Sequence, residues 1–217
     1  MPPLTRLYFT TRILKPILFL AALYPAGWLI WAALTGHMGA DPVKKLQVVT
    51  GTATLTLLLI TLTITPLRRL TGWSEAIRLR RMGGLFAFFY VTVHALTYFI
   101  LDQSLSPRLI VSDTIEHPRI AVGFAAFVLL IPLALTSTDK AIRRLGKRWA
   151  RIHQLVYVAA TLGVLHYLWV VKRDVRQPLV YAWLLVALLS VRVWFQWQKR
   201  WAERARATGT ERVEAVG

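Results

Sequence analysis

The sequence predicts an all-α fold: an integral membrane bundle of six transmembrane helices with both termini in the cytoplasm. Three observations favour this fold. Of the 217 residues, 56% are hydrophobic and the mean hydropathy is +0.49, values that a soluble domain of this size does not show. Apolar stretches of about 20 residues, enough to cross the hydrocarbon core of a bilayer, recur along nearly the whole chain. The basic residues gather between these stretches, and they do so mostly in alternate loops.

The boundaries of the first three helices follow from the residues that flank the apolar runs. We expect helix one over Ile17–Leu34, followed by a loop with two glycines at 35–42. Helix two is predicted over Leu46–Pro66, where a proline ends the pattern, and a short basic loop follows at 67–81. Helix three is predicted over Met82–Leu101, and its Gly83-Gly84 pair allows a neighbouring helix to approach closely.

The second half of the chain continues the same alternation of apolar runs and polar connections. An outer loop at 102–118 is expected to contain a short surface helix around Leu109–Ile115, and helix four is predicted over Arg119–Leu135. Residues 136–139 then cap a basic amphipathic stretch over Lys140–Arg151. Helix five is predicted over Trp149–Val171 and helix six over Pro178–Trp197. We expect residues 1–201 to form a single domain. Residues 202–217 are polar, and their composition predicts a disordered tail.

The distribution of positive charge sets the predicted orientation. With the N-terminus inside, the inner side carries the C-terminal basic run together with Arg6, Arg12, Lys15, Arg68, Arg69, Arg78, Arg80, Arg81, Lys140, Arg143, Arg144, Lys147, Arg148 and Arg151. The outer side keeps Lys44, Lys45, Arg108, Arg119, Lys172, Arg173 and Arg176. This bias predicts cytoplasmic termini. It also accounts for the net charge of +17, so the charge does not call for a nucleic-acid partner.

Three histidines fall within the predicted hydrocarbon region: His94 in helix three, and His153 and His166 in helix five. Ionisable residues at that depth are functional candidates. The chain has no cysteine, which excludes thiolate-bound clusters and covalent c-type heme, so a redox centre must be held in another way. No predicted span carries an acidic residue at its centre, which argues against proton-coupled transport and intramembrane hydrolysis.

The depths of two of these histidines match. Helices three and five run in the same direction, and at 1.5 Å per residue His94 lies roughly 18 Å above Met82, while His166 lies about 17 residues above Trp149. Two imidazoles at one level can bind a heme iron from opposite faces. The sequence therefore predicts a heme between His94 and His166 in the outer leaflet.

His153 lies near the inner leaflet, too far from the other two histidines for all three to bind one zinc ion. Fourteen residues, close to four helical turns, place Arg80 on the same face as His94, so a second heme could use His153 with Arg80 at its other face or its propionates. Equally, Arg80 and Arg81 could serve only as topology charges. On a straight helix His153 and His166 lie roughly 140° apart. Gly163 is a place where helix five could distort to relieve this mismatch.

Simpler interpretations of the same residues stay open. Buried histidines can merely hydrogen-bond between helices, in which case the chain would be a small-solute carrier or a structural membrane protein. His37 and His117 fall in outer loops, where a ligand role is not expected.

Several short motifs together resemble the heme-binding membrane subunits of bacterial periplasmic methionine-sulfoxide reductase systems. Apart from Ala40, all of them lie within Asp41–Tyr181. The motifs are Ala40-Asp41-Pro42-Val43-Lys44, Thr50-Gly51, Ile64-Thr65-Pro66-Leu67, Arg80-Arg81, the His94 helix, Leu135-Thr136-Ser137-Thr138, Leu145-Gly146-Lys147-Arg148-Trp149, His153-Gln154-Leu155-Val156-Tyr157 and His166-Tyr167-Leu168-Trp169. More distantly, the chain is similar to the membrane domain of ferric reductases and NADPH oxidases.

The resemblance implies a multi-pass protein of the bacterial inner membrane that carries one or two b-type hemes, with FMN as an optional further cofactor. It implies heme ligands at His94, His153 and His166. Arg80 stands where the oxidase relatives have an inner-heme histidine. It further implies electrons from a cytoplasmic flavin reductase and a periplasmic molybdopterin-containing partner, on which the reduction of methionine sulfoxide is expected.

Overall fold

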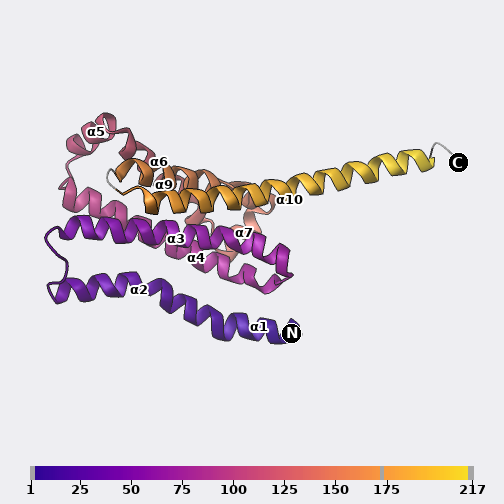
Figure 1. Ribbon diagram of the computed structural model, residues 1–217, viewed down its shortest axis with the longest axis horizontal. Coiled ribbons are helices and arrows are strands. Elements are labelled where there is room, and N and C mark those ends of the chain that lie inside the picture. Colours follow the sequence, from indigo (N-terminus) through magenta and orange to yellow (C-terminus); the bar gives the residue numbers. More distant parts are fainter. Residues whose placement is uncertain (1–2, 172–173, 215–217) are drawn as a thin grey trace.

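The computed structural model describes residues 3–171 and 174–214 and is helical throughout its regular elements. Most of the helices run roughly parallel or antiparallel to one long axis, and both termini lie toward the same end of the bundle (Figure 1). We refer to that end as the inner end. Within the described residues, five helical segments are long and apolar enough to cross a membrane: Thr5–Leu34, Pro42–Thr71, Ser74–Asp102, Pro118–Leu135 and Arg176–Trp201. The predicted all-α fold with several membrane spans is thereby confirmed, whereas the predicted number of six spans stays a prediction.

The chain begins with one continuous helical run. It comprises α1 (Pro3–Tyr8), the π-helical turn η1 (Phe9–Leu14) and α2 (Lys15–Leu34), and it passes along the side of the bundle (Figure 1). Buried Tyr90 attaches α2 to α4, because its hydroxyl donates to the carbonyl of Ala22 and accepts from the amide of Ala26.

The next two spans are both longer than the sequence predicts. α3 covers Pro42–Thr71, starting at the Asp41 cap, and passes through Pro66 instead of stopping there. Pro66 removes only one amide donor, and neighbouring groups in a bundle can compensate for that loss. The true end is Gly72, whose φ of +68° suits a glycine C-cap. The predicted basic loop at 67–81 is therefore wrong: after the short η2 (Ser74–Ala76), Arg80 and Arg81 already lie within α4 (Ile77–Leu96).

α4 continues into the π-helical turn η3 (Thr97–Asp102), which ends at the outer end of the bundle. A Cβ on Gly83 would lie 2.6 Å from the Thr61 hydroxyl of α3, which confirms the predicted close approach of these two helices. The expected surface helix is α5 (Pro107–Glu116), and α6 covers Pro118–Leu135, close to its predicted bounds.

The fifth predicted helix is broken near its start. Thr138 caps α7 (Asp139–Leu145), Gly146 separates it from α8 (Lys147–Ile152), and a turn at His153 and Gln154 precedes α9 (Leu155–Val170). The distortion expected at Gly163 therefore lies ten residues earlier. Gly163 instead allows close packing, since a Cβ there would lie 3.0 Å from Leu55 of α3.

The last helix, α10 (Arg176–Glu214), returns to the inner end and extends beyond the rest of the bundle (Figure 1). Residues 202–214, for which composition predicts a disordered tail, belong to this helical run. The topology charges Lys172 and Arg173 lie outside the described residues, as do residues 215–217.

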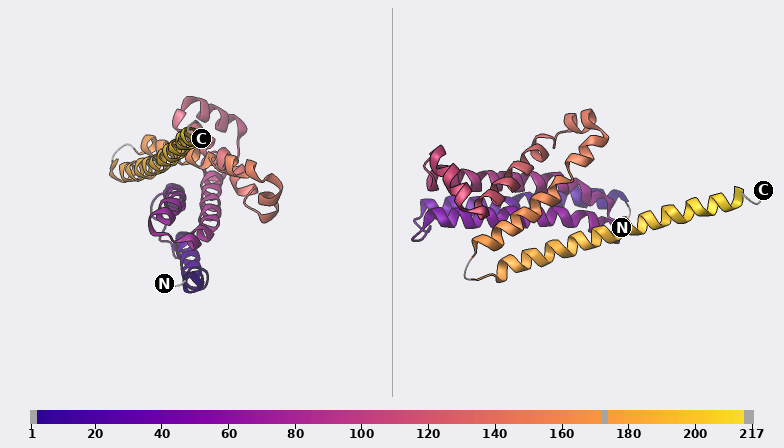
Figure 2. Two further views of the ribbon diagram at one scale, coloured as in Figure 1. Left: turned by 90° about the vertical axis from the view of Figure 1, so that its right-hand side faces the viewer. Right: turned by 90° about the horizontal axis from the view of Figure 1, so that it is seen from above.

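The apolar core joins five helices. Its buried members include Leu55 of α3, Ala87 of α4, Leu130 of α6, Val164 of α9 and Leu185 of α10. The two views in Figure 2 show α3, α4, α6 and α9 gathered together, with the connection through α7 and α8 projecting from the bundle. This core fixes the relative positions of α4 and α9, the two helices that carry His94 and His166.

Candidate functional site

His94 is held against α3. Its Nδ1 lies 3.0 Å from the carbonyl oxygen of Gln47 and 3.4 Å from the Thr50 hydroxyl. A carbonyl can only accept, so Nδ1 of the neutral ring carries the hydrogen and donates it to Gln47. The Nε2 atom then keeps its lone pair, which is the electronic state that a metal ligand requires.

His166 is held in the same manner against α6. Its Nδ1 donates to the carbonyl oxygen of Arg119 over 2.7 Å. Within residues 3–171 and 174–214, the Nε2 atoms of His94 and His166 take part in no hydrogen bond. Each imidazole thus has one nitrogen anchored to a neighbouring helix and one lone pair available.

The two imidazoles lie close together. Their ring centres are 6.2 Å apart and their planes are nearly perpendicular, at 86°. A metal–imidazole bond is about 2.0–2.1 Å, and the nitrogen lies roughly 1.1 Å from the ring centre, so two imidazoles on opposite sides of one metal have centres about 6 Å apart. The donor type and the spacing both fit the two axial ligands of a heme iron.

Two glycines make room for these rings, and sequence reasoning missed their role. A Cβ on Gly51 would lie 3.2 Å from the His94 ring, and a Cβ on Gly123 would lie 2.6 Å from Nδ1 of His166. Glycine therefore lets the backbone of α3 and α6 approach the imidazoles. Gly51 is part of the Thr50-Gly51 motif, but nothing in the sequence connects Gly123 with His166, which is 43 residues away.

His153 has different surroundings. Its Nε2 lies 3.1 Å from the Thr136 hydroxyl, and its ring stacks on Trp149 with centres 4.0 Å apart. The Thr136 hydroxyl already donates to Pro132 over 2.6 Å, so Nε2 of His153 must donate to Thr136. This Nε2 has no free lone pair, and the geometry therefore does not fit a heme ligand at that nitrogen.

The positive charge of Arg80 acts on His153. His153 occupies the turn before α9, outside the apolar helix, and burial, followed by the charge of Arg80, lowers the pKa of its imidazole. The remaining histidines are engaged elsewhere: Nδ1 of His37 bonds the Thr35 hydroxyl, and Nδ1 of His117 lies 2.8 Å from the Asp113 carboxylate.

Comparison with known proteins places this geometry in context. Residues 48–164 match the family described as ferric reductase like transmembrane component, and this range contains His94 and His153. The chain is similar to proteins named protein-methionine-sulfoxide reductase heme-binding subunit MsrQ. The one from Herminiimonas arsenicoxydans is 48% identical over 90% of this chain and 91% of its own length.

Two further relatives carry the same name. The protein from Bordetella pertussis is 48% identical over 88% of this chain and 94% of its own length. The protein from Xanthomonas axonopodis pv. citri is 46% identical over 89% of this chain and 92% of its own length. No solved structure matches the chain.

Proposed function

We propose that this chain, which belongs to the MsrQ family of heme-binding subunits of protein-methionine-sulfoxide reductase, carries electrons across a bacterial inner membrane to the catalytic subunit of that reductase. One observation carries the proposal: the ring centres of His94 and His166 are 6.2 Å apart, and neither Nε2 has a hydrogen-bond partner among the described residues. A b-type heme bound there would supply one-electron chemistry to a chain that has no cysteine.

The residues around the pair keep both imidazoles ready for this role. The carbonyl oxygens of Gln47 and Arg119 orient the rings and increase the electron density at each Nε2. Gly51 and Gly123 leave space beside the rings. Because the histidine pair lies toward the outer end, electrons would leave the chain on the side opposite its termini.

We extend the proposal to six spans with both termini inside. α9 is uncharged over its 16 residues and follows α8 almost directly, so it is the candidate for the sixth crossing. An even number of crossings agrees with termini at one end of the bundle (Figure 1). The inner end would then meet a cytoplasmic flavin reductase as electron donor, and the outer end the periplasmic molybdopterin-containing catalytic subunit.

Two cofactor expectations have less support. The inner heme at His153 and Arg80 stays a prediction, because Nε2 of His153 donates to Thr136, and our proposal assigns no step to it. Bound FMN also stays a prediction, since the names of the relatives mention heme alone.

The rival function is a carrier or structural membrane protein whose histidines only join helices. Both Nδ1 bonds would suit that rival. Two adjacent imidazoles whose Nε2 atoms have no hydrogen-bond partners in the described part of the chain do not, because a purely structural histidine pair would be expected to use them.

Transmembrane electron transfer can be measured in liposomes that contain ferricyanide and the purified heme-loaded chain, with a membrane-impermeant reductant outside. We expect the wild type to reduce the trapped ferricyanide. His94→Ala and His166→Ala should slow it at least about tenfold, toward the rate of protein-free liposomes. His117→Ala, an outer histidine away from the pair, is the matched control and should keep the wild-type rate. Equal rates for His94→Ala and the wild type would refute the proposal.

A further inference from the structure

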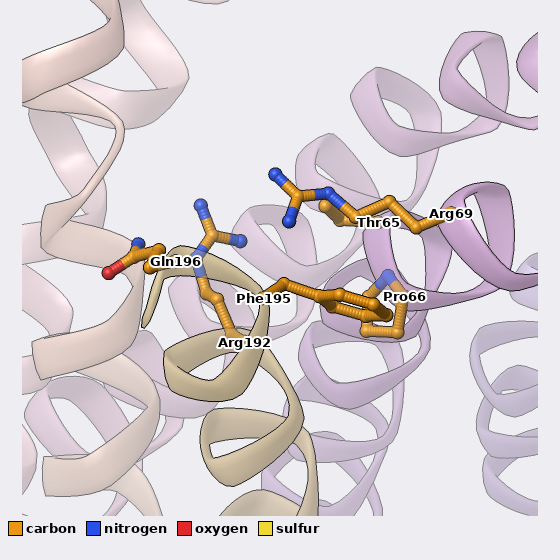
Figure 3. Close-up of a pocket in the computed structure, with 6 residues that line it drawn as sticks. All are labelled: Thr65, Pro66, Arg69, Arg192, Phe195 and Gln196. Atoms are coloured by element: carbon orange, nitrogen blue, oxygen red, sulfur yellow. The ribbon is translucent and has the colours of Figure 1, made fainter. Parts of the chain in front are cut away.

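A pocket at the inner end of the bundle lies between α3 and α10. It is lined by Thr65, Pro66, Arg69, Arg192, Phe195 and Gln196 (Figure 3). Its empty space amounts to about 260 Å³, part of it open to the surroundings. The side chains of Arg69 and Arg192 enter from different helices, and their guanidinium groups extend into the same gap (Figure 3).

Aromatic rings cover one flat face of each guanidinium. Arg69 lies over the ring of Phe195 at 5.1 Å, and Arg192 lies over the ring of Tyr157 at 4.3 Å. Such stacking holds the flat group in place but leaves its N–H edge unused. The N–H groups at the edges of both guanidinium groups are therefore held in a fixed orientation, and the stacked ring does not occupy them.

These donors have no acceptor among the described residues. In the part of the chain that the structure describes, Arg69 and Arg192 make neither a salt bridge nor a side-chain hydrogen bond. Bringing the like charges of Arg69 and Arg192 together in one gap is unfavourable unless an anion offsets them.

A buried hydroxyl adjoins the same place. A second hollow, lined by Leu62, Pro66, Tyr157, Leu188, Leu189 and Arg192, shares Pro66 and Arg192 with the first. The Tyr157 hydroxyl is buried and has no hydrogen-bond partner among the described residues. An oxygen-rich ligand at Arg192 would have this additional donor close by.

The level of the pocket along α10 indicates which anion it meets. Trp194 and Trp197, on either side of Phe195, are about half exposed. Tryptophans of this kind favour the membrane–water interface, where lipid phosphates lie. Arginine is also suited to phosphate, because its fork of N–H donors matches two phosphate oxygens.

We propose that Arg69 and Arg192 form a binding site for a phosphate group at the inner membrane surface. The proposal goes beyond heme-based electron transfer and does not depend on it. The level of the pocket favours the phosphodiester of an anionic phospholipid. A soluble phosphate ester arriving from the inner side would use the same contacts.

The test is native mass spectrometry of the full heme-loaded chain in detergent, titrated separately with phosphatidylglycerol, phosphatidylcholine, inorganic phosphate and FMN. The test variant is R69Q/R192Q. The matched control is R143Q/R144Q, which removes two exposed positive charges from α7.

We expect the wild type to bind one phosphatidylglycerol more tightly than phosphatidylcholine. R69Q/R192Q should bind it at least about tenfold more weakly, as expected for the loss of charge-assisted hydrogen bonds. The control should change less than twofold.

The other outcomes also decide the proposal. Tight binding of inorganic phosphate or FMN but not phosphatidylglycerol, lost in R69Q/R192Q, would support the site and assign it to a soluble ligand. Equal binding of every probe by the wild type and R69Q/R192Q, or equal weakening in the control, would overturn it. If R69Q/R192Q fails to fold, R69K/R192K keeps both charges but removes the fork, and binding should then fall about threefold or more. Unchanged binding by this variant would count against the site.

Discussion

Gly123 is the residue on which the position of His166 depends most directly. An added methyl group would lie 2.6 Å from Nδ1, too close for any real contact, and the neighbouring α6 backbone cannot move without breaking the bond to Arg119. We expect Gly123→Ala to lower the heme content of the purified chain several-fold. Gly51→Ala, at 3.2 Å from His94, should cause a smaller loss.

The matched control is Gly84→Ala, because a Cβ at Gly84 has open space around it. The measurement is heme per polypeptide, from the Soret absorbance and the protein concentration. If Gly123→Ala kept the wild-type heme content, the glycine would not be needed to seat the imidazole.

At the same scale, the sequence predicts some of the site but not all of it. Helical rise alone places His94 and His166 at one depth, and the structure brings their rings within 6.2 Å. The bonds of both Nδ1 atoms to backbone carbonyls depend on how α3 and α6 pack, which residue types do not encode. The engagement of Nε2 of His153 by Thr136 was not foreseeable for the same reason.

At the scale of elements, α9 packs on α3 through Gly163. A Cβ there would lie 3.0 Å from Cδ2 of Leu55, whose side chain is buried in the core. We expect Gly163→Ala to destabilise the protein by about 1–3 kcal/mol, as overpacking does. Thermal unfolding in detergent would measure the loss.

Gly27→Ala is the control for this prediction, since Gly27 also lies inside a helix but faces open space. Because alanine has a higher helix propensity than glycine, Gly27→Ala should leave the stability of the protein unchanged or slightly higher. The packing interpretation would fail if both variants shifted the midpoint equally.

The helix boundaries show why local signals mislead in a membrane bundle. Pro66 is a valid stop signal in an isolated helix, yet α3 continues to Thr71, since neighbouring groups in a membrane bundle can make up for one missing donor. The basic residues at 78–81 favour a loop by composition, yet they lie in α4, because long arginine side chains can extend from a helix to reach polar surroundings. The break before α9 lies at His153 and Gln154, where no glycine or proline indicates it.

At the scale of the whole molecule, the proposed orientation can be tested because the chain has no cysteine. We expect Ser112→Cys, on exposed α5, to react with a membrane-impermeant maleimide added to intact cells. Lys140→Cys, on α7 at the other end, should react only after the membrane is opened. The reverse pattern would place the termini outside.

We propose that His94 and His166 bind the same iron, and the amount of heme per polypeptide in single and double variants shows whether they do. Two ligands of one iron act together, so His94→Ala, His166→Ala and the double variant should all lose the same amount of heme. His153→Ala should keep the absorbance of the outer heme. If the losses of the two single variants instead added up in the double variant, the histidines would serve separate sites and would not share an iron.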